Sequence, residues 1–99
     1  MAGKKVTATV TSPGTIISAT VTDQNQLVHQ LVGDGSSKSA DLHAEEDGTL
    51  QWFLTVSAAP QTGWTFTLTP EGASSALVTR TGVIDDSALG TDAGAILVP

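Results

Sequence analysis

Gly63-Trp64-Thr65-Phe66-Thr67-Leu68-Thr69-Pro70 is the stretch that decides the fold of this 99-residue chain. Its large apolar residues alternate with threonines along the whole segment. Because successive side chains of a β-strand point to opposite faces, one face of the segment is apolar and the other carries hydroxyl groups. The stretch therefore predicts a strand of an antiparallel sheet, with one face in the core and the other in water.

Similar alternation recurs between turn signals along the rest of the chain. The expected strands cover residues 6–11, 16–22, 27–32, 39–45, 50–57, 63–70, 76–84 and 95–98. Pro, Gly, Asn and Asp mark the turns between them. Seven to eight short strands at this spacing predict an all-β antiparallel fold, either a two-sheet sandwich or a barrel. No linker divides the chain, so we expect a single domain over residues 1–99.

Some segments carry more specific expectations. In the second strand, the apolar face is expected to hold Ile17, Ala19 and Val21. Segment 27–32 is more continuously apolar, which predicts a central strand or one buried on both faces. Segment 39–45 has a charged outer face, which is typical of a protected edge strand. Residues 85–94 are polar and predict a long loop before the short last strand.

Composition argues against several classes of partner. The net charge is −6, and the four basic residues are scattered with no interleaved aromatic residues. Nucleic acid and anionic membrane surfaces are therefore not expected as partners. The chain has no cysteine, which excludes disulfides, thiolate metal sites and cysteine nucleophiles. No apolar run is long enough for a transmembrane helix, so no membrane insertion is expected.

The start of the chain does not resemble a secretory signal. Basic residues are followed by alternating Val and Thr instead of a continuous apolar run. We therefore expect a cytoplasmic or particle-associated protein, or one exported by a leaderless route, unless a signal has been removed.

Three segments resemble strands of bacterial immunoglobulin-like modules. Residues 14–23 (GTIISATVTD) are similar to the second strand and turn of such modules, and residues 47–52 (DGTLQW) and 63–69 (GWTFTLT) to later strands. The resemblance covers residues 14–70. It implies an immunoglobulin-like sandwich that serves as a spacer or adhesive module on a bacterial surface or a virion, and it carries over no catalytic residues.

Metal binding is one candidate chemistry. The acidic segment 85–92 holds Asp85, Asp86 and Asp92, and carboxylates on a loop suit calcium, although their spacing does not match an EF-hand. The alternative is a solvated loop with turn-forming residues. A zinc site would combine His43 and Glu45, which share a strand face, with His29. The alternative here is a charged solvent face.

Catalysis is not expected from this sequence. It contains no nucleophile elbow and no phosphate-loop spacing. A carboxylate pair for glycoside hydrolysis needs a cleft, for which a sandwich of this size offers little depth.

The aromatic residues suggest a binding role. Trp52 and Trp64 fall on apolar strand faces, so they are core residues or else a stacking platform for sugars or a protein hot spot. Phe53 falls on the opposite face of its strand. Together with Val28 and Val32, which break strict alternation, it predicts self-association through a sheet face.

The sequence thus predicts a non-catalytic structural or binding module for protein–protein assembly or adhesion. Sheet-face or edge-strand pairing would be its mechanism. One alternative is a carbohydrate-binding, lectin-like module that uses Trp52 or Trp64 with a calcium-assisted acidic loop. Another is a small enzyme inhibitor with a projecting loop at residues 33–37 or 58–63.

Overall fold

Residues 3–99, which the computed structural model describes, form nine β-strands and no helix, and so no helix there is long and apolar enough to cross a membrane. Residues 1 and 2 lie outside the described part. They belong to the N-terminal segment that was compared with secretory signals above. The strands are β1 Lys5–Thr11, β2 Ile16–Thr22, β3 Val28–Gln30, β4 Val32–Gly33, β5 Ser37–His43, β6 Thr49–Ala58, β7 Gly63–Pro70, β8 Val78–Val83 and β9 Leu89–Leu97.

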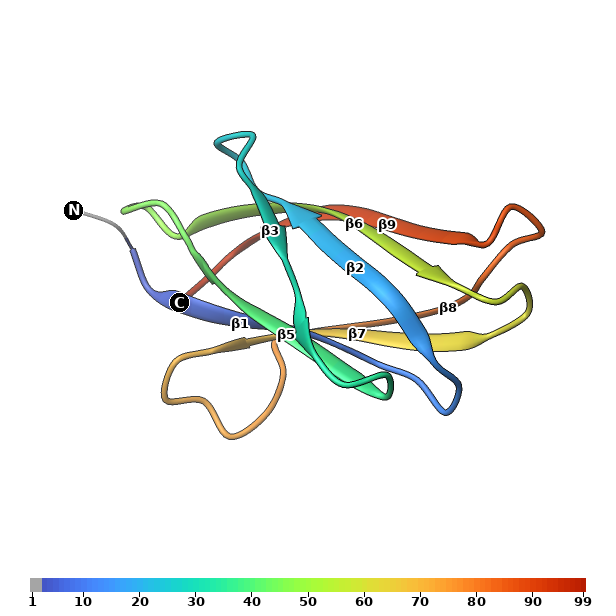
Figure 1. The fold of residues 1–99 in the computed structure, drawn as a ribbon. Coiled ribbons are helices and arrows are strands. Elements are labelled where there is room, and N and C mark those ends of the chain that lie inside the picture. Colours follow the sequence, from blue (N-terminus) through green and yellow to red (C-terminus); the bar gives the residue numbers. More distant parts are fainter. Residues whose placement is uncertain (1–2) are drawn as a thin grey trace.

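The strands form two antiparallel sheets that face each other (Figure 1). One sheet has the order β4-β5-β1-β7-β8 and the other has the order β3-β2-β6-β9. The hairpins β2–β3, β4–β5 and β7–β8 stay within a sheet, whereas the remaining connections cross from one sheet to the other. The two sheets remain separate, so the prediction of an all-β antiparallel sandwich is confirmed.

The core lies between the inner faces of the two sheets. Val10 of β1 faces Phe66 of β7 in register, and both are fully buried. From the opposite sheet, Leu54 of β6 and Val21 of β2 pair in register and are buried as well. Burial alternates strictly along β1, β6 and β7. The expected inner and outer faces of these strands are therefore confirmed.

The second strand departs from simple alternation. A β-bulge shifts the register between Ile16 and Ser18, so Ile16 is buried and Ile17 is 69% exposed. The expectation that Ile17 shares the inner face with Ala19 and Val21 was wrong for Ile17. A bulge adds one unpaired residue to a strand, and this residue reverses the alternation that precedes it.

Segment 27–32 is not one buried strand. It forms the short edge strands β3 and β4, which belong to different sheets. Leu31 lies at the crossing between them, where its N–H bonds to the carbonyl of Ala19 and its side chain is buried. The expectation of a central or doubly buried strand was wrong, because the apolar run follows a corner of the sandwich.

The region 85–97 also differs from the expectation. Residues 85–88 form a tight turn, and β9 then pairs with β6 along its whole length. The predicted long loop at 85–94 and short last strand at 95–98 were therefore wrong. The inner face of β9 carries Gly90, Asp92 and Gly94, which have low β-propensity and concealed the strand.

The expected edge strand at 39–45 corresponds to β5, which lies between β1 and β4. Strand β4 pairs only with Lys38 and Ser39. The second half of β5, with Asp41 and His43, is therefore a sheet edge, as its charges predict.

Candidate functional site

The outer face of the β3-β2-β6-β9 sheet combines exposed apolar side chains with a lack of charge, and we call it the Phe53 face. Phe53 of β6 points outward and is 51% exposed. The strand register places it in one row across the sheet with Val28 of β3, Thr22 of β2 and Ala93 of β9. The alternation of side chains along its strand predicted that Phe53 points outward. Only the pairing of the strands in the structure places it in one row with Val28.

The Phe53 face is apolar in places and uncharged throughout. Leu89 and Leu97 are exposed at the two ends of β9, and they add to Phe53 and Val28. The other outward positions of these four strands, within residues 3–99, are Thr, Ser, Gln and Ala, together with the exposed Ile17 at the bulge of β2. None of the described outward positions carries an ionisable group. The face therefore differs sharply from a chain of net charge −6 taken as a whole.

A shallow open hollow of about 400 Å³ lies beside Phe53. Its floor and walls include Thr22, Gln51, Ala93 and Gly94. The small residues of β9 leave room next to the larger ring of β6. This hollow gives the otherwise flat sheet face a recess in which a partner side chain could lie.

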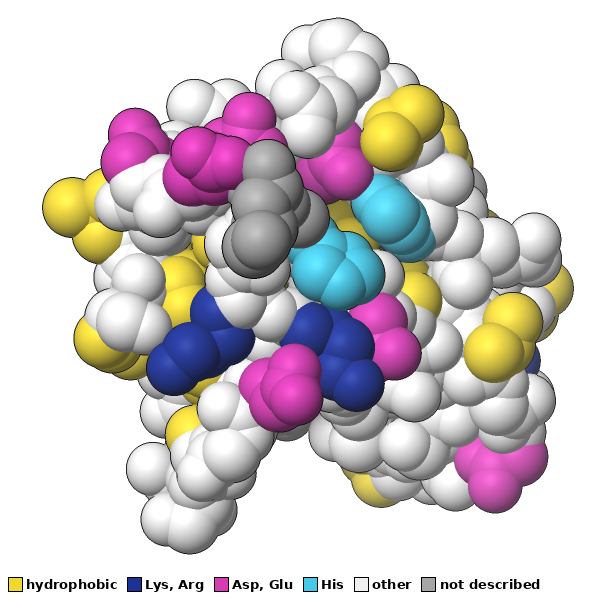
Figure 2. Space-filling view, turned by 90° about the vertical axis from the view of Figure 1, so that its left-hand side faces the viewer, with side chains coloured by type: hydrophobic (Ala, Val, Ile, Leu, Met, Phe, Trp, Pro, Cys, Tyr) yellow, Lys and Arg dark blue, Asp and Glu magenta, His cyan; other side chains and the backbone are white. Residues whose placement is uncertain are grey.

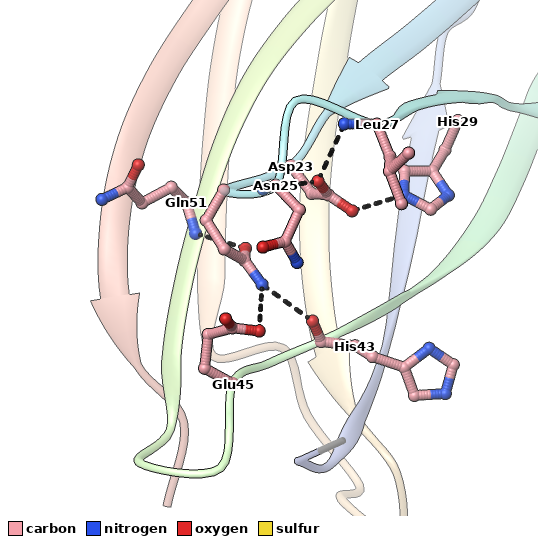
Figure 3. Close-up of polar contacts among 8 residues, drawn as sticks. Asp23, Asn25, Leu27, His29, His43, Glu45 and Gln51 are labelled. Carbon is pink, nitrogen blue, oxygen red and sulfur yellow. Dashed lines mark hydrogen bonds and ion pairs between the residues drawn. The ribbon is translucent and has the colours of Figure 1, made fainter. Parts of the chain in front are cut away.

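The β2–β3 turn borders this hollow and is fixed by Asp23 (Figure 3). One carboxylate oxygen of Asp23 accepts hydrogen bonds from the N–H groups of Asn25 (2.8 Å) and Leu27 (3.1 Å), and the other lies 2.8 Å from Nε2 of His29. Burial opposes ionisation of Asp23. Nevertheless, its pKa is lowered from 3.8, because these hydrogen bonds and the positive potential of His29 favour the carboxylate. Gln26 takes a left-handed φ of 66° in the same turn.

Gln24 ties the same turn to neighbouring segments. Its side-chain amide donates to the carbonyl of His43 (3.1 Å) and to a carboxylate oxygen of Glu45 (3.2 Å), and its oxygen accepts the N–H of Gln51 (3.2 Å). Acidic, basic and histidine side chains gather at this end of the sandwich (Figure 2). The uncharged Phe53 face thus borders a strongly charged end of the molecule.

Both tryptophans are core residues. Trp52 is 3% exposed and Trp64 is 6% exposed, so neither indole offers a stacking platform to a ligand in solution. The indole N–H of Trp52 donates to Asp92 (2.9 Å), and Arg80 bonds the other oxygen of Asp92 (3.4 Å). Nε1 of Trp64 is buried without a hydrogen-bond partner in the described part of the chain.

The acidic residues proposed for calcium do not lie in one loop. Asp85 accepts hydrogen bonds from the N–H groups of Ser87 and Leu89 and so fixes the turn before β9. Asp86 accepts a hydrogen bond from Gln61, and Asp92 lies inside β9.

The residues considered for zinc do not gather around one point either. His29 contacts Asp23, and the ring of His43 points away from this pair (Figure 3). Across residues 3–99 there is no group of three or more His, Cys, Asp or Glu side chains placed to hold a metal ion.

The remaining candidate residues separate in the structure. Val32 lies in β4 of the opposite sheet, so it does not share a patch with Phe53 and Val28. Residues 33–37 and 58–63, considered as inhibitor loops, form tight turns closed by backbone hydrogen bonds. A loop that does project from the sandwich is 71–77, between β7 and β8 (Figure 1).

The fold and surface define a cysteine-free antiparallel β-sandwich with one uncharged, partly apolar sheet face. Comparisons of the chain with protein-family models, with curated proteins and with solved structures found no match.

Proposed function

We propose that this chain is a non-catalytic assembly module that associates with protein, and first with a second copy of itself, through the Phe53 face. The observation that carries the proposal is the exposure of Phe53, Val28, Leu89 and Leu97 on a face without ionisable side chains among its described outward positions. Exposed apolar side chains that share one face of a domain are typical of protein–protein contact sites.

Charge supports the choice of this face over the rest of the surface. Two copies that each carry a net charge of −6 repel one another. Contact across an uncharged face leaves the ionised groups in water, so no carboxylate has to lose its hydration. Contact through the charged end near Asp23 and Glu45 would instead require ionised side chains to lose their hydration.

The free edge of β9 lies beside the Phe53 face, and a strand of another molecule can pair with it and so extend the sheet. The edge strands β3 and β4 are three and two residues long, whereas β9 has nine residues. Strand β9 contains no Lys, Arg or Pro, and its carboxylate, Asp92, points inward. Long edges without such protection are templates for pairing with another strand.

Sedimentation velocity over a wide range of protein concentration tests the proposal. We expect species heavier than the 10.1 kDa monomer, with a fraction that rises with concentration. The variant Ala95→Lys, which places a cation on the outward side of β9, should shift the equilibrium toward monomer. A wild-type protein that stays at 10.1 kDa throughout would contradict self-association.

A carbohydrate-binding module is the second candidate, and the hollow beside Phe53 favours it. An exposed aromatic ring next to the side chains of Gln26 and Gln51 combines stacking with amide hydrogen bonding. Titration of neutral oligosaccharides followed by NMR tests it. Shifts confined to this hollow and abolished by Phe53→Ala would support this function, and an unchanged spectrum would exclude it for those sugars.

A further inference from the structure

The outer face of the other sheet carries a regular array of hydroxyl groups, which we call the hydroxyl lattice. Strands β5, β1, β7 and β8 are neighbours in this sheet (Figure 1), and each contributes one side chain to each of two adjacent rows. The first row is Ser39, Thr9, Thr67 and Thr79. The second row is Ser37, Thr11, Thr65 and Thr81.

The hydroxyl groups of this lattice are free to bind a ligand. No side-chain hydroxyl in the two rows bonds to another group within residues 3–99, although Thr7, in the next row, donates to Asp41. All eight positions are exposed or half-buried. Neighbouring strands are about 4.8 Å apart and alternate residues of one strand about 6.8 Å apart, so the groups form a two-dimensional grid.

The charge and composition of the lattice restrict what it can bind. Ionisable side chains of this sheet face lie beyond the rows, at Lys5, Asp41 and His43. A charged polymer therefore finds no counter-charge on the rows themselves, and complementarity requires a neutral surface. No aromatic side chain of the described chain lies in the two rows, so sugar rings lack a stacking partner.

Ice is a neutral surface of this kind. Its prism faces expose water oxygens with repeats close to both spacings of the grid. Each of the six threonines in the two rows offers a hydroxyl group that can join the water lattice and a methyl group that can sit between water molecules, whereas Ser37 and Ser39 offer a hydroxyl group alone. Sheet twist rotates successive strands by about 20°. The best match is therefore expected over the adjacent strands β1 and β7, at Thr9, Thr11, Thr65 and Thr67.

We propose that the hydroxyl lattice is an ice-binding surface. The test uses the purified full chain in a slowly frozen solution and measures two quantities, the share of protein taken up by growing ice and the growth of ice grains during annealing. The wild type is expected to enter the ice and to arrest grain growth. Thr67→Lys, which places a charged side chain in the centre of the grid, is expected to lose both effects.

Two further variants separate binding from folding. Thr67→Ala only truncates the side chain and is expected to reduce uptake into ice while keeping the thermal unfolding of the wild type. Ser74→Lys is the matched control, because Ser74 is an exposed hydroxyl residue of the 71–77 loop, outside both the hydroxyl lattice and the Phe53 face. It is expected to behave as the wild type.

Each alternative outcome overturns the proposal. Exclusion of the wild-type protein from ice, to the extent seen for an inert protein of the same size, would contradict ice binding directly. Equal loss in Thr67→Lys and Ser74→Lys would show that uptake into ice does not depend on the lattice. Adsorption to crystalline cellulose or chitin without uptake into ice would assign the surface to a polysaccharide instead.

Discussion

The indole N–H of Trp52 donates a hydrogen bond of 2.9 Å to Asp92, and this contact joins the adjacent strands β6 and β9 on the inner side of their sheet. The guanidinium of Arg80 bonds the second oxygen of Asp92 at 3.4 Å and lies 5.5 Å from the centre of the Trp52 ring. The carboxylate of β9 is thereby held on the inner side of the sheet. As a result, the outer face of β9 carries no charge and can belong to the Phe53 face.

Loss of the Asp92 carboxylate should destabilise the fold. In Asp92→Ala the indole N–H of Trp52 stays buried without its acceptor and Arg80 loses its partner, so we expect a loss of about 1–3 kcal/mol in the free energy of unfolding. Asp92→Asn keeps an acceptor for Trp52 and should lose less. Urea unfolding followed by tryptophan fluorescence measures both, and Asp86→Ala, at an exposed carboxylate, is the control. A loss in Asp92→Ala no greater than in the control would contradict this role.

Glycine at position 82 makes room for Trp64. A β-carbon there would overlap with Cζ2 of the Trp64 ring, so Gly82→Ala must displace a buried indole. We expect a loss of about 1–3 kcal/mol from overpacking. At Gly63 the nearest atom to an added β-carbon is 4.0 Å away, so Gly63→Ala is the matched control. Thermal unfolding compares the two variants, and equal midpoints would contradict the close packing at Gly82.

The free energy of unfolding should fall as acidification protonates Asp23. The pKa of Asp23 is lowered from 3.8 in the folded protein, so its contribution is complete above pH 3.8 and is lost as pH falls through the folded pKa. The pKa values of Asp34 and Asp47 are lowered as well, because nearby side-chain and backbone donors bond to their carboxylates. Asp23→Asn should therefore flatten, but not abolish, the pH dependence of unfolding below pH 3.8. An unchanged slope in this variant would exclude the Asp23 contacts as its source.

The limits of sequence reasoning lie in particular segments. Alternation is a local property, so it correctly assigned the faces of β1, β6 and β7 and pointed Phe53 outward. The bulge at Ile17 and the corner at Leu31 depend on how the chain passes between sheets, which local pattern does not encode. Strand β9 was missed because Gly90 and Gly94, which lie against the tryptophan rings, read as loop residues.

That omission also concealed most of the candidate site. Ala93, Leu89 and Leu97 complete the Phe53 face only when β9 pairs with β6. The hydroxyl lattice was equally hidden, since the threonines of β1, β7 and β8 form rows only through the strand register.

Light scattering coupled to size-exclusion chromatography, applied to a matched pair of charge variants, tests the assembly proposal most directly. Phe53→Glu introduces a carboxylate into the Phe53 face, and Thr67→Glu introduces the same group on the outer face of the opposite sheet. We predict that the wild type and Thr67→Glu elute as the same oligomer, while Phe53→Glu elutes at the monomer mass of 10.1 kDa. An oligomer that survives in Phe53→Glu and dissociates in Thr67→Glu would contradict the account.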